Sequence, residues 1–303
     1  MSPIIHIGYH KTGTTFLQMN AFTSNAYNFK RLWVDGAAIE KIVLTHPMRF
    51  DADAIRQEFF LAADGPGIPV ISHEALSGTP SMGRYYGFEV ADRLKSIFGE
   101  AKIIIGIREQ KSIIRSLYDE YIIRGGTQNL EQFIGTKLDR PGYRPLCRID
   151  NFEYNLLISK YIDLFGKSNV IVMPLEILRT NKDCYMRMLL DFTGAEGPVQ
   201  ADHPPRNVGR GAFVMEIERR INHVLKFDNA QFSDYKDYPL SIRLKNRSLR
   251  IAQKYLPKNL NANREKRYKA LISQFVGPYF QGSNTQTARI TGLDLEALGY
   301  DMG

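Results

Sequence analysis

Cysteine is scarce in this sequence, and so are long hydrophobic runs. The 303 residues include only Cys147 and Cys184, which excludes a disulfide scaffold, and two cysteines alone cannot make a tetrahedral zinc site. No apolar run approaches the roughly 18 residues that cross a bilayer. The N-terminus also lacks the basic and apolar regions of a signal peptide. These absences predict a soluble, cytoplasmic protein with reduced thiols.

The remaining composition is that of a globular protein whose charge is unevenly placed. Hydrophobic residues make up 44% and charged residues 24% of the chain, which excludes a disordered or fibrous protein. Of the net charge of +8, the excess lies in residues 236–269, where 11 Lys and Arg stand against 2 acidic residues. Such a basic segment is either a solvated helical face or a surface for an anionic partner.

Short apolar runs alternate with helical patterns over the first two thirds of the chain. Continuous apolar strands between helices are typical of a parallel sheet that is covered on both faces. The predicted strands are residues 4–7, 68–72, 102–107 and 170–173. Beyond Asp191 strand signals fade and helical patterns remain, with Pro204-Pro205 as a possible joint. We therefore expect an α/β core over residues 1–200 and a helical part over residues 201–303, packed together as one domain.

The first predicted strand leads into a glycine-containing loop and then a helix. Its residues are His10, Lys11, Thr12, Gly13, Thr14 and Thr15. Glycine lets backbone N–H groups turn toward one anion, and lysine and hydroxyl side chains complete a phosphate-binding loop. The loop differs from G-x-x-x-x-G-K-[ST], because the lysine stands two residues before the glycine. An ordinary turn with a surface lysine is the alternative.

A second anion site is predicted where the third strand ends. Arg108 stands at the carboxyl end of that strand, the edge where open α/β sheets bind ligands. Ser116 follows eight residues later on the next helix. An arginine fork and a serine hydroxyl suit a phosphate group. The alternative is a surface arginine that pairs with Glu109 or Glu120.

The two segments together resemble the bacterial branch of the sulfotransferases that use 3′-phosphoadenosine 5′-phosphosulfate (PAPS), on a P-loop-like α/β fold. The resemblance extends to the tail, at Gly292-Leu293-Asp294-Leu295. It implies that Lys11 and residues 12–15 hold the 5′-phosphosulfate, and that Arg108 and Ser116 hold the 3′-phosphate. It also implies that no metal is required and that 3′-phosphoadenosine 5′-phosphate (PAP) is the product. His10 and Thr12 depart from the family pattern, where many members have Pro and Ser.

Residues for the chemical step follow from the same resemblance. Lys11 is the expected stabiliser of the leaving phosphate. Glu74, which follows the second predicted strand, is the first candidate for the base, and His73 is the second. A packed histidine and a helix-start acid are the alternatives. Arg206 and Arg210 either close over the nucleotide or belong to a hinge.

The expected reaction is in-line transfer of a sulfuryl group from PAPS to a hydroxyl, with an amine second, of a carbohydrate or glycolipid. One alternative is a P-loop kinase or NTPase that uses ATP and Mg²⁺. Another is a non-catalytic protein that binds an anionic polymer or a membrane surface. No nucleic-acid motif is present. Leu240, Leu244, Ile251 and Tyr255 can share one helical face beside a basic one, as an amphipathic helix does. Acceptor identity and oligomeric state stay open.

Overall fold

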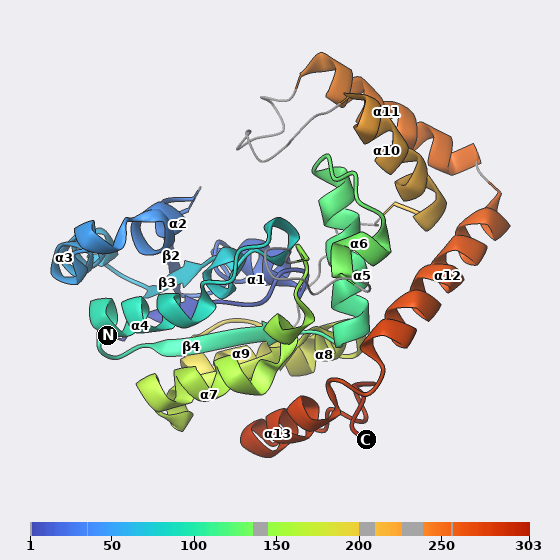
Figure 1. Ribbon diagram of the computed structural model, residues 1–303. Coiled ribbons are helices and arrows are strands. Elements are labelled where there is room, and N and C mark those ends of the chain that lie inside the picture. Colours follow the sequence, from blue (N-terminus) through green and yellow to red (C-terminus); the bar gives the residue numbers. More distant parts are fainter. Residues whose placement is uncertain (1, 35, 136–144, 200–209, 226–238, 256) are drawn as a thin grey trace.

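One parallel β-sheet forms the centre of the computed structural model, which describes residues 2–34, 36–135, 145–199, 210–225, 239–255 and 257–303 (Figure 1). Within these ranges the sheet has five strands in the order β2-β3-β1-β4-β5, and every pair is parallel. The strands are β1 (Ile4–His6), β2 (Phe29–Leu32), β3 (Ile68–Ser72), β4 (Lys102–Ile107) and β5 (Val170–Pro174). The predicted α/β class is confirmed, and the four predicted strands are present.

Helices cover both faces of the sheet, as the continuous apolar strands predict. One face packs against α3, α4, α5 and α7, and the other packs against α1, α8 and α9. These helices are α1 (Thr14–Asn20), α3 (Ala52–Ala63), α4 (Gly87–Phe98), α5 (Gln110–Ile123), α7 (Tyr154–Phe165), α8 (Leu175–Thr180) and α9 (Lys182–Thr193). Short elements complete the core: α2 (Ala37–Ile39), η1 (Glu40–Leu44), η2 (Pro47–Arg49), η3 (Glu74–Ser77), η4 (Pro80–Met82), α6 (Leu130–Ile134), η5 (Ile149–Phe152) and η6 (Lys167–Asn169).

The strand order reverses between β1 and β4. The chain runs from β1 outward to β2 and back through β3, and then crosses to β4 and β5 on the other side of β1. The loop after β1 leads to α1 on one face of the sheet, and the loop after β4 leads to α5 on the other. Open α/β sheets bind ligands at such a point, because the two departing loops leave a crevice between them.

The strand β2 is the element that sequence patterns miss. Among the described strands it pairs with β3 alone, at one edge of the sheet, and all four of its residues are half-buried. Its sequence, Phe29-Lys30-Arg31-Leu32, places two basic residues among the apolar ones. Charged residues are common on edge strands because they discourage pairing with another chain. They also remove the continuous apolar run by which the buried strands are identified.

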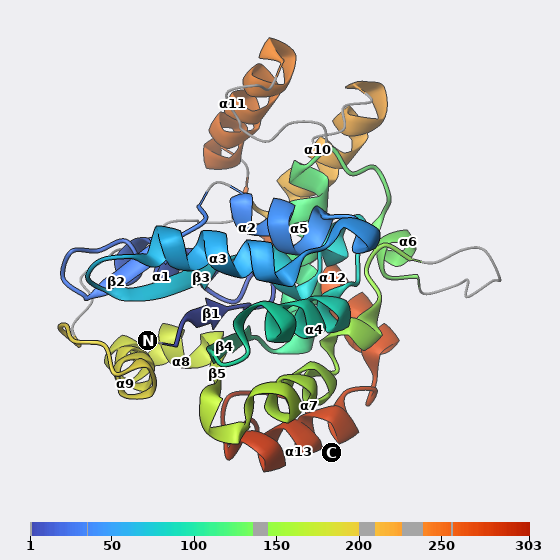
Figure 2. The same cartoon turned by 90° about the vertical axis from the view of Figure 1, so that its left-hand side faces the viewer.

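In the described ranges beyond residue 210, the core is followed by α10 (Ala212–Leu225), α11 (Leu240–Tyr255), α12 (Lys258–Val276) and α13 (Gln281–Thr291) (Figure 2). Both α10 and α12 contact α5, and α13 contacts α7, whereas α10 and α11 project away from the sheet (Figure 1). The predicted helical character of the last third is confirmed. The joint at Pro204-Pro205 lies outside the described residues, and the division at residue 200 stays a prediction. Within the described ranges, no helix has the length and apolarity to cross a bilayer.

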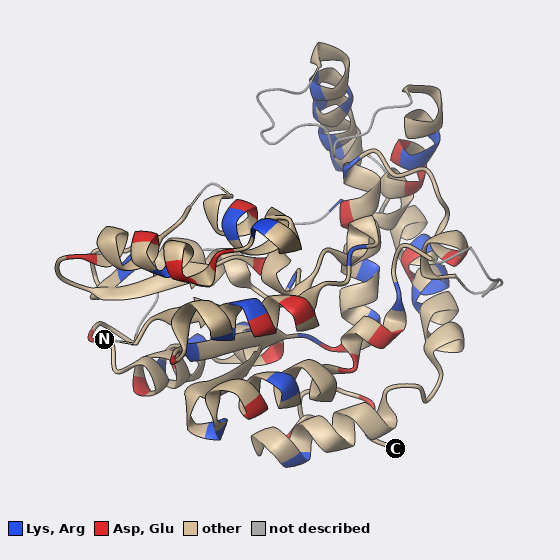
Figure 3. Cartoon of the chain, turned by 60° about the vertical axis from the view of Figure 1, so that its left-hand side comes forward, with Lys and Arg blue, Asp and Glu red and all other residues tan. Residues whose placement is uncertain are grey.

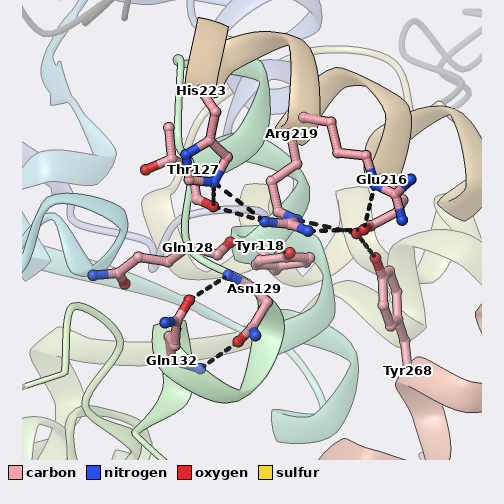
Figure 4. A network of polar contacts seen from close by, with 10 residues as sticks. Tyr118, Thr127, Gln128, Asn129, Gln132, Glu216, Arg219, His223 and Tyr268 are labelled. Carbon is pink, nitrogen blue, oxygen red and sulfur yellow. Dashed lines mark hydrogen bonds and ion pairs between the residues drawn. The ribbon is translucent and has the colours of Figure 1, made fainter.

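Polar contacts attach α10 to the core (Figure 4). The Arg219 guanidinium donates to the Thr127 carbonyl oxygen at 3.0 Å and to a Glu216 carboxylate oxygen at 2.8 Å. Tyr268 of α12 donates its hydroxyl to the same carboxylate at 3.3 Å. His223 lies 2.9 Å from the Thr127 carbonyl oxygen. Arg219 therefore links α10 to the segment that follows α5.

Candidate functional site

The loop between β1 and α1 has an unusual backbone. Lys11 has φ 66° and Gly13 has φ 89°, both in the left-handed region. A non-glycine residue costs roughly 1–2 kcal/mol there. Such strain persists only where the surrounding structure enforces it, as at many functional sites. The Thr12 hydroxyl enforces it here, because it is buried and donates to the Tyr9 carbonyl oxygen at 2.5 Å. Thr12 thus shapes the loop, whereas Lys11 and Thr15 are exposed.

The loop lies directly on β4. The N–H of Tyr9 donates to the Gly106 carbonyl oxygen at 2.9 Å. A Cβ atom at Gly106 would stand 2.7 Å from the Thr12 hydroxyl oxygen, a distance that side chains do not tolerate. Glycine inside an otherwise apolar strand is therefore explained by this close approach. Within the described parts of the chain, no oxygen accepts a hydrogen bond from the backbone N–H groups of residues 13–15.

Arg108, from the second predicted anion site, contacts the loop that forms the first. Its Nη1 donates to the Lys11 carbonyl oxygen at 3.3 Å, and its Nε donates to the Ser112 hydroxyl at 2.6 Å. Glu109 does not pair with Arg108, because its carboxylate accepts the N–H groups of residues 111 and 112 at the start of α5. The strand-end arginine and the loop lysine, which are 97 residues apart in sequence, therefore meet where the strand order reverses.

Ser116 lies on the face of α5 that borders the loop. Residues four apart share one helix face, so Ser112, Ser116 and Glu120 form a row along α5. The first of them contacts Arg108, and the last contacts Lys11. Ser116 is half-buried between these two contacts. The direct hydrogen bond from Arg108 goes to Ser112, and the binding role of Ser116 stays a prediction.

Lys11 is held by an acidic partner. Its Nζ lies 3.2 Å from a Glu120 carboxylate oxygen, and Arg124 pairs with the other oxygen at 2.9 Å. Burial alone would raise the pKa of Glu120, but the positive charges of Lys11 and Arg124 outweigh it and hold the pKa below its ordinary value. The carboxylate therefore stays ionised at neutral pH. The predicted alternative, in which Glu120 pairs with Arg108, is wrong because Glu120 faces Lys11.

A second arginine stands near Arg108. Burial, and next the like charge of Arg179, lower the pKa of the Arg108 guanidinium. Arg179 is exposed at the end of α8. Like charges repel, and the carboxylates of Glu176 and Glu109 act on Arg108 in the opposite sense. The sequence analysis did not identify Arg179, because only the sheet order shows that the end of β5 lies next to that of β4.

Glu74 follows β3 at the same edge of the sheet. Its carboxylate accepts from Gln18 Nε2 at 3.5 Å, and Gln18 also donates to the Ser72 carbonyl oxygen at 3.3 Å. Burial would raise the pKa of Glu74, but the histidines at 10 and 73, when charged, lower it below its ordinary value. Glu74 is thus an ionised carboxylate at neutral pH, oriented by a side chain of α1.

The two histidines of the site are held in fixed tautomers. His73 Nδ1 accepts the N–H of Ala75 at 3.1 Å, so in the neutral ring the proton resides on Nε2. His10 lies with Nε2 3.1 Å from the Gly78 carbonyl oxygen, which requires the proton on Nε2 there too. Burial lowers the pKa of both imidazoles. His73 could accept a proton only by releasing its contact with Ala75, which favours Glu74 as the base.

Arg210 lies away from the loop. It pairs with the wholly buried carboxylate of Glu218 on α10 and donates to the Asn246 side-chain oxygen on α11 at 3.2 Å. In this structure it therefore joins the two projecting helices. Arg206, the other residue predicted to close over a nucleotide, lies outside the described residues.

A pocket of about 330 Å³ opens beside the loop and the Glu74 turn. It shares Tyr9 with the loop and Ser77 with the turn, and Tyr85 and Phe88 add aromatic rings. The Tyr85 hydroxyl accepts the N–H of Arg148 at 2.6 Å. The remaining lining residues are Gly87, Arg148, Asp150, Asn151, Glu153, Leu156 and Leu157. Aromatic and polar side chains together suit a ligand with hydroxyl groups.

The sequence identifies the main charged residues of the site but not the residues that contact them. It does not show the roles of Gln18 and Ser112, or that Glu120 pairs with Lys11. The spacing of residues 112, 116 and 120 along one helix face is a signal that could have shown two of them. Gln18 gives no such signal, because it lies on the helix after β1 whereas Glu74 follows β3, 56 residues later in the sequence.

Comparison with known proteins gives similarities among solved structures. No family model matches the sequence, and no curated protein matches it. Among solved structures, the chain is similar to a sulfotransferase from Alicyclobacillus acidocaldarius, over 68% of this chain and 87% of that one, with 16% sequence identity and a TM-score of 0.47.

Proposed function

We propose that this protein is a sulfotransferase that moves a sulfuryl group from PAPS to a hydroxyl group. The observation that carries the proposal is the contact between Arg108 and the Lys11 carbonyl oxygen at the reversal of strand order. A nucleotide with phosphate on both its 3′ and 5′ sides needs two cationic sites that are adjacent but separate. The two strands that meet there supply one each.

The described residues fit such a nucleotide. The loop offers unoccupied N–H groups at residues 13–15 and the Thr15 hydroxyl beside the Lys11 ammonium. Arg108 has five N–H groups, and two of them are engaged with Ser112 and Lys11. The other three remain for a phosphate, with the Ser116 hydroxyl on the adjacent face of α5. The donors of the loop match the 5′-phosphosulfate, and those of Arg108 and Ser116 match the 3′-phosphate.

PAPS, when bound, supplies a sulfuryl group that is activated by its bond to a phosphate leaving group. The side chain of Lys11 neutralises charge on the departing phosphate oxygen. For this it must exchange the Glu120 carboxylate for the nucleotide, which its exposed position permits. Glu74 accepts the proton of the attacking hydroxyl, and Gln18 orients its carboxylate. The sulfur–oxygen bond to the phosphate breaks as the bond to the acceptor oxygen forms.

The pocket beside Tyr9 and Ser77 is the proposed acceptor site. Its aromatic rings suit the faces of a sugar, and its acidic and amide side chains suit hydroxyl groups. This composition supports a carbohydrate or glycolipid acceptor. An amine acceptor is second.

Ligand-dependent thermal stability tests the proposal. A ligand at 100 times its dissociation constant stabilises a folded protein by about 2.7 kcal/mol. We expect PAP to raise the melting temperature clearly, and ATP with Mg²⁺ to have a much smaller effect. A strong response to ATP and Mg²⁺ without a response to PAP supports a kinase or NTPase instead. A response to neither, with stabilisation by an oligonucleotide or an acidic polysaccharide, supports a non-catalytic binding protein.

A further inference from the structure

The helix α11 carries an exposed apolar stripe. Leu240, Leu244, Ile251 and Tyr255 are exposed to 68, 52, 48 and 82%. Their spacing places them within one narrow sector of the helix. The sequence predicts that these residues share a face, and the structure turns that face outward. Scattered apolar residues on a surface need no explanation, but four in one row on one helix do.

Contacts on the opposite side of α11 fix its orientation. Ile242, Lys245, Asn246 and Leu249 are the buried residues of this helix. The Lys245 ammonium lies 3.0 Å from the buried carboxylate of Glu218 and donates to the Asn222 side-chain oxygen at 2.9 Å. Because these polar groups are paired inside, α11 cannot turn its apolar stripe inward without leaving buried charges unpaired.

Positive charge borders the stripe along one side. Arg243, Arg247, Arg250 and Lys254 are exposed, and their spacing places them in the sector next to the apolar one. The helix contains no acidic residue. Within the described parts of the chain, none of these four side chains forms an ion pair. Figure 3 shows Lys and Arg repeated along α11, which projects from the top of that view beyond the sheet.

We propose that the outward face of α11 docks this protein on a lipid membrane that contains anionic lipids. A helix with apolar residues on its exposed sector and basic residues beside them lies in the plane of the membrane interface. The apolar side chains enter the boundary between headgroups and acyl chains, and the cations contact anionic headgroups.

Charge complementarity favours a membrane over other partners. An acidic polymer would bind the basic residues but leave the four apolar side chains in water. A second copy in a two-fold contact would place the same patch against itself, so the arginines of one helix would face those of the other. A surface that is anionic and is apolar beneath its headgroups satisfies the two sectors together.

Vesicle flotation with the full chain tests this proposal. The probes are phosphatidylcholine vesicles, with or without about one third phosphatidylglycerol. We expect the anionic vesicles to bind the protein at least tenfold more tightly. The double variant Arg247→Gln/Arg250→Gln should lose about 25-fold, since each basic residue near an anionic surface contributes roughly fivefold. Leu244→Glu/Ile251→Glu should lose at least as much, because it places charge where acyl chains should lie.

A matched control and an insertion probe accompany these variants. Met48→Glu/Leu61→Glu changes two exposed apolar residues on η2 and α3. Since α3 lies apart from α11 (Figure 1), this variant should bind vesicles like the wild type. In Leu244→Trp, the new indole emission should shift to shorter wavelength on anionic vesicles only. Each variant should keep the wild-type melting temperature, because the changed side chains are exposed.

Three results would overturn the membrane assignment. Equal binding to neutral and anionic vesicles removes the role of the basic sector. Binding to heparin without binding to vesicles identifies a polymer site. A protein that is dimeric by light scattering, becomes monomeric in Leu244→Glu/Ile251→Glu and never binds vesicles identifies the face as an interface between copies.

Discussion

Replacement of Arg108 by alanine should weaken binding at only one end of the nucleotide. Three of its five N–H groups are free of the contacts with Ser112 and Lys11. Two charge-assisted hydrogen bonds to a phosphate contribute a net roughly 1.5–3 kcal/mol each after competition with water. Because Arg108 is half-buried, we take about 3 kcal/mol for the pair. The affinity for PAP should then fall about 100-fold.

Calorimetric titration with two nucleotides measures this effect. PAP and AMP differ only by the 3′-phosphate, so Arg108→Ala should leave the weaker binding of AMP within about threefold. Lys11→Ala should weaken both, because Lys11 serves the 5′ side that they share. Lys111→Ala is the matched control. It removes a cation three residues away that pairs with Asp301 at 3.3 Å, and it should change neither affinity by more than about twofold.

The outcome that refutes the reasoning is an equal loss for PAP and AMP in Arg108→Ala. Since Arg108 also holds the Lys11 carbonyl oxygen, such a result would mean that it acts by shaping the loop and does not contact the 3′-phosphate. An unchanged PAP affinity would reject both roles.

Three further predictions concern acid–base groups. Glu74→Gln should lower kcat by 10²- to 10⁴-fold while PAP affinity stays within about twofold, and His73→Ala should have the smaller effect; the reverse order in steady-state kinetics contradicts the assignment. Glu120→Gln should tighten PAP binding by about fivefold, because a competing carboxylate is removed, and calorimetry that finds weaker binding excludes this competition. Burial lowers the pKa of His6 to about 4, below its unfolded value. The free energy of unfolding should therefore fall by up to about 3 kcal/mol as pH drops from 6.5 toward 4. Urea unfolding of His6→Gln should show a smaller fall over this pH range, and an equal fall refutes this cause.

The central sheet is predictable from sequence because its inner strands are continuous and apolar. Residues 103–105 in β4 are wholly buried isoleucines, and β3 is buried throughout. The strand β2 could not be found in the same way, because an edge position tolerates Lys30 and Arg31. Helix starts with side-chain caps were also predictable. Asp51 accepts the N–H groups of residues 53 and 54 at the start of α3, as aspartate commonly does at a helix N-terminus.

The site was predictable in its parts but not in its assembly. The Lys11 loop and Arg108 each carry a local signal, yet their contact depends on the adjacency of β1 and β4, which no local pattern contains. The same limit applies to α11. Periodicity placed Leu244 and Ile251 on one face, but which face is buried depends on Glu218 of another helix.

The ion pair between Lys11 and Glu120 has a consequence for which solutes can enter the loop. A tethered carboxylate competes at a fixed effective concentration that dilution cannot lower. Chloride, bicarbonate and inorganic sulfate would contact the Lys11 ammonium alone, so they should not displace the Glu120 carboxylate. A ligand that also binds Arg108 gains additional binding free energy, which should be enough to displace the Glu120 carboxylate. On the proposed function, Glu120 should therefore favour anions that also reach Arg108 over small anions that reach Lys11 alone.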